Sequence, residues 1–98
     1  MILLVNLLHL ISDAEAETVL AGITRALAPA GKAFLYGPFL RDGEATSEGD
    51  ATFHASLRAQ DPAIGYKDIA WVRDRLAPMK TETLDMPSNN LMIIVSAN

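Results

Sequence analysis

The stretch from Tyr36 to Asp68, YGPFLRDGEATSEGDATFHASLRAQDPAIGYKD, separates two regular parts of the chain. Strand-forming residues, Ala33 to Tyr36, run directly into it, and Gly37-Pro38 ends that strand. The stretch therefore begins as a loop at the carboxyl end of a buried strand, the edge where open α/β sheets bind ligands. The alternative is a long solvated loop that leads into a surface helix.

The residues before this stretch predict a strand, a helix and a second strand. Ile2 to Val5 is a continuous apolar run, typical of strands covered on both faces. Ser12 and Glu15 then form a capping box. The apolar side chains of the helix repeat at helical spacing: Ala16, Val19, Leu20, Ile23 and Leu27. A strand, a helix and a strand of this length predict a parallel pair with a right-handed crossover.

The residues after Pro38 predict two more helices. Ser47 caps the first, from about Glu48 to Gln60, in which Phe53 and Leu57 supply a narrow apolar stripe. Asp68 caps the second, in which apolar residues again repeat at helical spacing: Ile69, Val72 and Leu76.

Two strands, Lys80 to Met86 and Leu91 to Ser96, follow these helices. The tight turn Pro87-Ser88-Asn89-Asn90 makes them antiparallel neighbours. The predicted fold class is α/β, half of a Rossmann-like sheet with two parallel strands, a C-terminal antiparallel hairpin and three helices. The predicted sheet order is the first, second, fourth and third strands of the chain.

Composition indicates an ordinary globular domain, which we place at residues 1–98. Half of the residues are apolar and 20% are charged, which excludes a disordered chain. The 8 basic residues are scattered among 12 acidic ones, which argues against nucleic-acid and anionic-membrane partners. Without cysteine there is no disulfide frame or Cys-based zinc site, and we expect a cytoplasmic location.

The order of predicted elements resembles the C-terminal half of the class I S-adenosylmethionine-dependent methyltransferase fold. Four segments resemble a family of uncharacterised methyltransferase-like proteins: NLLHLIS at Asn6 to Ser12, YGPFLRDGEATSEGD at Tyr36 to Asp50, DPAIGYKD at Asp61 to Asp68, and MPSNNL at Met86 to Leu91. The second segment is the most specific of the four. The resemblance covers nearly the whole chain.

The resemblance also implies what the chain lacks. In the family, a glycine-rich turn after the first strand and an acidic residue ending the second hold the donor, and no G-x-G occurs here. The resemblance therefore implies a methyltransferase-like subdomain without the donor-binding half, which does not bind S-adenosylmethionine alone and is inactive unless another polypeptide completes it. The alternatives are a non-catalytic homodimerising module and a small-metabolite-binding domain.

The resemblance places Asn6 and His9 near the methyl group of the donor, as the catalytic candidates. The Asn6 amide would hold a polar group of the substrate and contact the cofactor, and the His9 imidazole would take a proton from the acceptor. The structural alternative is that Asn6 caps the end of the strand and that His9 begins a helix and is bonded to backbone.

A loop that covers the acceptor and excludes water would assist methyl transfer. The candidate substrate-binding residues in such a cover are Tyr36, Asp42, Glu44, Ser47, Glu48, Asp50 and Arg58. For three of them, Ser47, Glu48 and Asp50, the alternative role is to stabilise a helix N-terminus.

Other polar and aromatic residues suggest weaker possibilities. Arg41, Arg58 and Lys67 are cations that could meet a carboxylate or phosphate, but their separation in sequence does not predict a patch. We expect Phe53 and Trp71 to pack against the sheet. No histidine spacing supports a metal site, and we expect none.

The predicted strand order leaves Ile2 to Val5 at one edge of the sheet. This edge is short, apolar and uncharged, as is typical of strands that recruit a partner. We therefore expect a homodimer in which the strands of two copies pair in antiparallel fashion about a two-fold axis.

Overall fold

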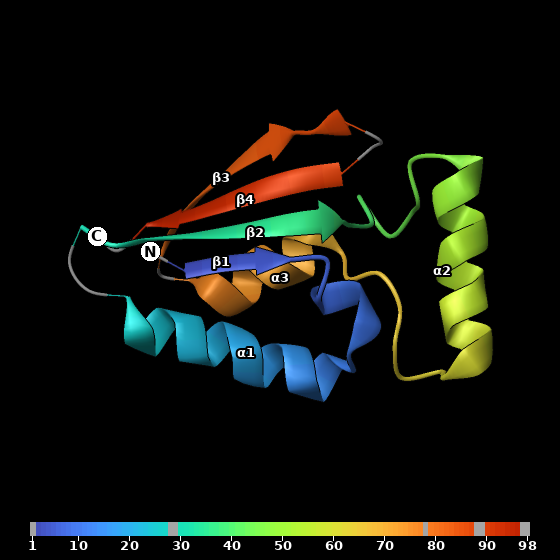
Figure 1. Ribbon diagram of the computed structural model, residues 1–98, viewed down its shortest axis with the longest axis horizontal. Helices are drawn as coiled ribbons and strands as arrows, with labels where there is room; N and C mark the ends of the chain where they lie inside the picture. Colours follow the sequence, from blue (N-terminus) through green and yellow to red (C-terminus); the bar gives the residue numbers. More distant parts are fainter. Residues whose placement is uncertain (1, 28–29, 78, 88–89, 97–98) are drawn as a thin grey trace.

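The computed structural model, which describes residues 2–27, 30–77, 79–87 and 90–96, contains one four-stranded sheet and three α-helices (Figure 1). The elements are β1 Ile2–Val5, the 3-10 helix η1 Leu8–Leu10, α1 Asp13–Ala26, β2 Lys32–Pro38, α2 Glu48–Gln60, α3 Ile69–Leu76, β3 Lys80–Asp85 and β4 Asn90–Ser96. The strands lie in the order β1-β2-β4-β3, so the predicted α/β fold class and strand order are confirmed.

The pairing of the strands is also as predicted. β1 pairs in parallel with β2, from Ile2 opposite Ala33 to Val5 opposite Tyr36. β4 pairs antiparallel with β2 on one side and with β3 on the other. Of the predicted hairpin turn, Ser88 and Asn89 lie outside the described residues. β2 and β4 are the two central strands, and β1 and β3 are the two edges.

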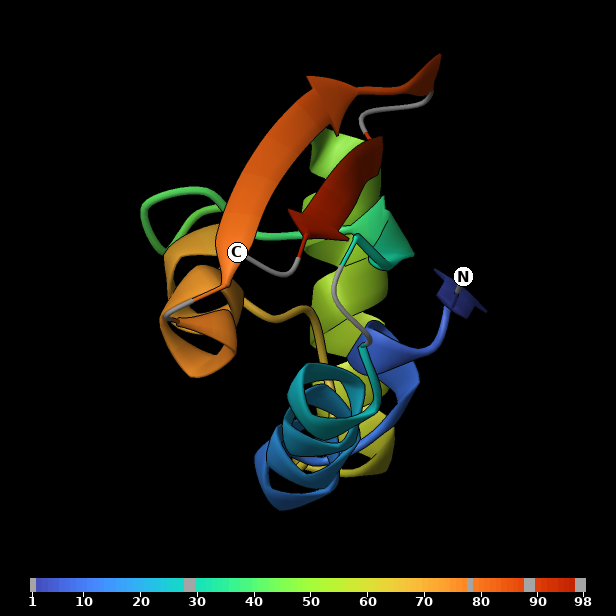
Figure 2. The same ribbon diagram turned by 90° about the vertical axis from the view of Figure 1, so that its left-hand side faces the viewer.

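Both α1 and α3 cover the same face of the sheet (Figures 1 and 2). Alternation along β2 and β4 directs every second side chain toward these helices. The resulting core draws on η1, both helices, β4 and the β2 segment: Leu8, Ala16, Leu20, Ile23, Ala33, Leu35, Phe39, Val72, Leu76, Leu91, Ile93 and Val95.

Local signals explain where the two core helices begin. The Glu15 N–H donates to Ser12 Oγ at 3.1 Å and the Ser12 N–H donates to Glu15 Oε1 at 3.0 Å, which is the predicted capping box. The Asp68 carboxylate accepts from the Ala70 N–H at 2.9 Å and caps α3. None of the described helices is long and apolar enough to cross a membrane.

The other face of the sheet carries apolar side chains in two rows. One row runs from Leu3 through Phe34 to Ile94, and the other from Val5 through Tyr36, Met92 and Leu84. Leu3 is 58% exposed, Val5 52% and Leu84 49%. No described helix covers these side chains, so we call the two rows the open face.

Helix α2 stands across the carboxyl end of the sheet rather than on either face (Figure 1). Its one buried residue is Leu57, while Phe53 is 45% exposed. The prediction that Phe53 packs against the sheet is therefore wrong, because α2 lies beyond the strand ends. Trp71 of α3 is partly buried against the core, as predicted.

We expect Leu20→Ala to lower the free energy of unfolding by about 2–5 kcal/mol, because it opens a cavity between α1 and the sheet. Leu20 is 0% exposed. The matched control is Leu84→Ala on the open face, for which we expect a change of about 0.5 kcal/mol or less. Urea denaturation followed by circular dichroism measures both. An equal loss in the two variants would contradict this description of the core.

Candidate functional site

The carboxyl ends of β1 and β2 lie side by side, and Asn6 follows directly after β1. The Asn6 N–H donates to the Tyr36 carbonyl at 2.8 Å, which extends the strand pairing by one bond. Asn6 then adopts a positive φ of 52°, a conformation that asparagine accepts more readily than most residues. Its Oδ1 lies 3.5 Å from the position of a Cβ on Gly37. Asn6 thus turns the chain out of the sheet while its amide stays beside β2.

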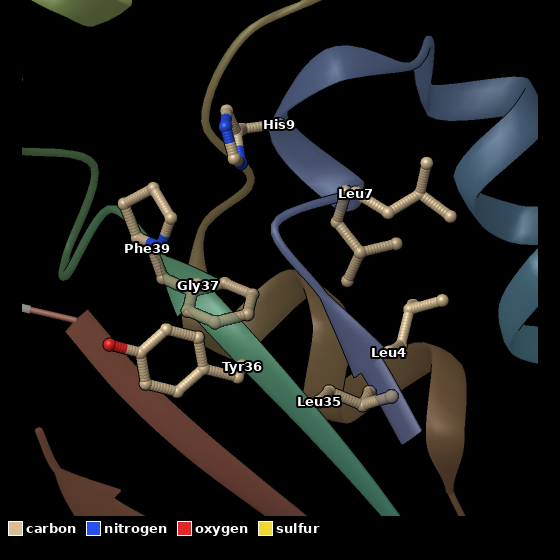
Figure 3. A pocket seen from close by; sticks show the side chains of 9 residues that line it. Leu4, Leu7, His9, Leu35, Tyr36, Gly37 and Phe39 are labelled. Atoms are coloured by element: carbon tan, nitrogen blue, oxygen red, sulfur yellow. The ribbon is translucent and has the colours of Figure 1, made fainter. Parts of the chain in front are cut away.

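His9 lies in η1 above the end of β2, as Figure 3 shows. It is 6% exposed and lines a small cavity of about 10 Å³, together with Leu35, Tyr36 and Phe39. Burial, followed by the nearby charge of Lys67, lowers the pKa of the His9 imidazole below its ordinary value of 6.5. The ring makes no hydrogen bond to any described residue. A neutral imidazole at pH 7 is therefore free to accept a proton.

Two aromatic rings hold His9 in place. The Phe53 ring lies 5.9 Å from the His9 ring at 63°, and the Tyr66 ring 5.8 Å away at 71°. Phe53 and Tyr66 also meet each other edge to face, at 6.1 Å. Such edge contacts add a modest stabilisation to burial. We call these three side chains the aromatic cluster; it joins η1, α2 and the connector between α2 and α3.

Hydrogen bonds fix Tyr66 within the aromatic cluster. Its hydroxyl donates to Asp50 Oδ1 at 2.7 Å, and the Ser47 hydroxyl donates to Asp50 Oδ2 at 2.9 Å. Burial, and then the hydrogen bond and charge of Asp50, raise the pKa of the Tyr66 phenol. Tyr66 therefore keeps its proton and acts as a hydrogen-bond donor to Asp50.

Lys67 ties the same connector to the start of α1. Its side chain is 4% exposed, and Nζ donates to the Ile11 carbonyl at 2.6 Å and to the Gly65 carbonyl at 3.0 Å. Asp13 Oδ1 lies 3.5 Å from Nζ. The Gly65 N–H donates to the His9 carbonyl at 3.2 Å. Burial lowers the pKa of the Lys67 ammonium, while Asp13 opposes that change. Lys67 and Gly65 thus join the connector to the backbone of His9 and of Ile11, two residues after it.

The structure brings some of the predicted site residues together and separates others. Asn6 and Tyr36 are joined by a backbone hydrogen bond at the strand ends, and His9 and Tyr36 line the same small cavity. The Tyr36 ring points away from His9, and its Oη accepts from Asn90 Nδ2 at 3.1 Å (Figure 3). Asp50 reaches His9 only through Tyr66. Ser47 accepts from the Asp50 N–H at 3.1 Å and caps α2, the alternative role considered for it.

The remaining predicted residues lie apart from His9. Asp42 and Glu44 are exposed in a turn whose Gly43 N–H donates to Asp68 Oδ2 at 2.6 Å. Glu48 is exposed in the first turn of α2. Arg58 lines a different pocket, beside Lys67. The predicted cover is therefore not one continuous surface over the strand ends. Among the described residues, no group of three or more His, Asp or Glu side chains is placed to hold a metal ion.

Sequence reasoning gave no role to Gly65 and Tyr66 of the connector and considered Lys67 only as a cation that could meet a carboxylate or phosphate; all three residues are buried. The available signal was a glycine, an aromatic residue and a lysine in succession between two helices. Such a connector is usually solvated, so nothing in its periodicity predicted burial.

Comparisons with known proteins give a family and a fold. Residues 1–96 match a family described as "Protein of unknown function (DUF938)". The chain is similar to human N-acetylserotonin methyltransferase in complex with SAM, with a TM-score of 0.82 and 13% identity over 98% of this chain and 28% of that one. It is similar to an O-methyltransferase family protein from Burkholderia thailandensis, with a TM-score of 0.80 and 16% identity over 98% and 29%. PigF with SAH gives a TM-score of 0.79 and 16% identity over 96% and 29%.

These similarities establish the methyltransferase fold for this chain. The chain spans less than a third of the length of each of these proteins, between 28% and 29%. It therefore corresponds to one part of a larger methyltransferase fold.

The described residues at the strand ends do not form a complete S-adenosylmethionine site. The cavity beside His9, of about 10 Å³, has room for about one water molecule, whereas a cofactor of this size occupies a cleft of roughly 300–1,000 Å³. Gly37 lies against the Asn6 side chain instead of in a glycine-rich turn. The described residues at the carboxyl ends of β1 and β2 could therefore form only one side of a cofactor site.

Stability should depend on pH through the two histidines, the buried His9 and the partly buried His54. Burial lowers the pKa of both His9 and His54 in the folded chain, so the unfolded chain binds protons first as the pH falls. We expect the free energy of unfolding to be greatest above about pH 6.5 and to fall as the pH drops through the folded pKa values. His9→Gln should weaken this dependence.

The measurement is urea denaturation of the wild type and of His9→Gln between pH 7.5 and pH 5. Because the variant has no charge to bury, the stability gap between the two proteins should narrow as the pH falls. A gap that stays constant across this range would show that His9 does not resist protonation.

Proposed function

Because this chain belongs to the DUF938 family of proteins of unknown function, which its residues 1–96 match, we propose that its role follows from its fold: it forms the acceptor side of an S-adenosylmethionine-dependent methyltransferase. The observation that supports this most is the position of His9, a buried imidazole at the carboxyl ends of two parallel strands. Open α/β sheets bind their ligands at this edge.

In this proposal His9 is the general base. Its lowered pKa keeps the ring neutral at pH 7, and its nitrogens are not engaged by any described residue. It would accept the proton of a hydroxyl or amine acceptor as the methyl group is received. Asn6 would hold a polar group of the acceptor through its amide, which lies beside Gly37. Methyl transfer depends chiefly on positioning, which the aromatic cluster provides by fixing His9.

The same proposal holds that another polypeptide segment supplies the donor-binding half. Two surfaces support it. β1, with the sequence ILLV, is an edge strand without a charge, whereas the opposite edge, β3, carries Lys80, Glu82 and Asp85. Charged residues protect an edge strand from further pairing, and β1 has no such protection. The open face next to β1 is apolar as well, so a segment with both a strand and a helical layer would cover edge and face together.

A second candidate, a non-catalytic homodimerising module, is favoured by the same uncharged edge. Two copies of β1 would pair in antiparallel fashion about a two-fold axis and give one continuous sheet. This arrangement satisfies the bare backbone groups of β1 and leaves the open face uncovered. The two candidates therefore use the same strand and differ in what else they bury.

The test of the acceptor-side role supplies the missing half. We expect isothermal titration of S-adenosylmethionine into the chain alone to give no heat. A fusion that carries the donor-binding half of another family member ahead of Ile2 should bind with a dissociation constant in the micromolar range, about −8 kcal/mol. A fusion that gives no heat, or micromolar binding by the chain alone, would contradict the proposal.

In that fusion, His9→Gln should lower methyl transfer by about 10²–10⁴-fold and leave the dissociation constant for S-adenosylmethionine unchanged, since the residue acts as a base. Release of S-adenosylhomocysteine with a panel of hydroxyl and amine acceptors measures the rate. Arg25→Gln is the control, because Arg25 is exposed on α1 and does not line the cavity beside His9. Equal losses in both variants would remove His9 from the proposed role.

The edge itself is tested by self-association of the isolated chain. We expect a dimer by light scattering at micromolar concentration, and a monomer for Leu3→Lys, because two lysines would then repel each other across the strand pair. Leu84→Lys is the control, since Leu84 is similarly exposed but lies on the opposite edge strand. A dimer that survives Leu3→Lys, or is lost with Leu84→Lys, would place the contact elsewhere.

A further inference from the structure

A second pocket, of about 210 Å³, lies between α2, the connector that follows it and the start of α3. It is separate from the cavity beside His9. Charged and polar side chains line it: Asp13, His54, Arg58, Lys67 and Asp68. The sequence did not predict that Arg58 and Lys67 would meet, and the structure corrects this because the chain turns back at Asp61 to Gly65. Their convergence brings two positive charges to the pocket, an exposed one on Arg58 and a buried one on Lys67, beside the carboxylates of Asp13 and Asp68.

The acidic groups of this pocket are already engaged. Asp68 Oδ2 accepts from the Gly43 N–H at 2.6 Å and Asp68 Oδ1 from the Ala70 N–H at 2.9 Å. Asp13 Oδ1 lies 3.5 Å from Lys67 Nζ. Asp68 therefore stabilises the turn at Gly43 and the start of α3, and Asp13 pairs with the buried Lys67.

Two hydrogen-bond donors of the pocket, His54 Nε2–H and the Arg58 guanidinium, have in contrast no acceptor among the described residues. His54 Nδ1 accepts from the Tyr66 N–H at 2.9 Å, so the neutral ring carries its proton on Nε2, where it can donate to a ligand. The Arg58 guanidinium makes no hydrogen bond or ion pair with any residue in the described ranges. Two adjacent donor groups on one helix thus lack an acceptor.

Gly65 sets the position of both donors. It has a φ of 141°, and a Cβ there would lie 2.9 Å from Arg58 Cδ and 2.9 Å from His54 Cε1. Only a glycine lets both side chains lie directly over the connector. Their placement is therefore built into the backbone.

We propose that this pocket binds an oxyanion, a carboxylate or phosphate group, held by the Arg58 guanidinium and by His54 Nε2–H above the Lys67 ammonium. A guanidinium binds two oxygens of such a group through parallel N–H bonds. Lys67 contributes its charge from below, since its own donors are occupied by backbone carbonyls. The site does not depend on methyl transfer, because none of these groups contacts the cavity beside His9.

Electrostatics of the unliganded pocket agree with this assignment. Burial, and then the charges of Arg58 and Lys67, lower the pKa of His54. Burial lowers the pKa of Lys67 as well; Asp13 opposes that change and the charge of Arg58 adds to it. An anion between these groups would relieve their mutual repulsion and stabilise protonated His54.

The experiment is a nuclear magnetic resonance titration of both imidazoles in sodium phosphate, in sodium acetate and in sodium chloride at one ionic strength. We expect the pKa of His54 to rise by about one pH unit in phosphate or acetate relative to chloride, the size expected for one opposite charge at about 4–6 Å. His9 is the internal control and should not change. Arg58→Gln should abolish the rise, whereas Arg25→Gln on the exposed side of α1 should keep it.

The arms of this experiment separate the sources of the oxyanion. A rise in both salts supports a site for either group, and a rise in phosphate alone narrows the ligand to a phosphate. Equal pKa values in all three salts, or a rise that survives Arg58→Gln, would overturn the proposal. Since Arg58 is exposed, its substitution leaves the core intact, and circular dichroism of the variant confirms that it is folded.

Discussion

Parallel pairing of β1 with β2 over Ile2 to Val5 positions Asn6, and through it η1 with His9, at the carboxyl edge of the sheet. It ends where the Asn6 N–H meets the Tyr36 carbonyl, and the positive φ of Asn6 then turns the chain into η1. A β-branched residue would resist that conformation, whereas asparagine accepts it at little cost. His9 consequently comes to lie over the end of β2. This is the position from which, in our proposal, it acts as a base toward the methyl acceptor.

The second constraint is that α1 and α3 cover the same face of the sheet. One face of β2 and β4 therefore forms a continuous core, while Leu3, Val5 and Leu84 remain largely exposed on the other. A sheet covered on both faces would bury these side chains, and each would contribute about 1.5–3 kcal/mol. The chain thus forgoes part of the stabilisation that its sequence offers. A partner that covers the open face would recover it, and the same partner would reach the unprotected backbone of β1.

The sequence predicted the elements and the order of the strands because these depend on local signals. The capping box at Ser12, the cap at Ser47 and the apolar run from Leu91 to Val95 each act within a few residues, and the strand order follows from the resemblance and from chain connectivity. The prediction for Phe53 failed for a different reason. Its contacts depend on where α2 stands relative to the strand ends, and no periodicity within the helix encodes that position.

The connector Gly65-Tyr66-Lys67 explains why the candidate site was the harder part to predict. Each of its residues acts on a segment distant in sequence: Gly65 supports His54 and Arg58, Tyr66 packs on His9, and Lys67 binds the Ile11 carbonyl. Burial of a lysine is costly unless its donors are satisfied, and here backbone carbonyls and Asp13 satisfy them. The conformation of the connector is therefore fixed by buried contacts, like that of a core strand. It holds the proposed base on one side and the proposed oxyanion pocket on the other, so the geometry of both depends on three consecutive residues without regular structure.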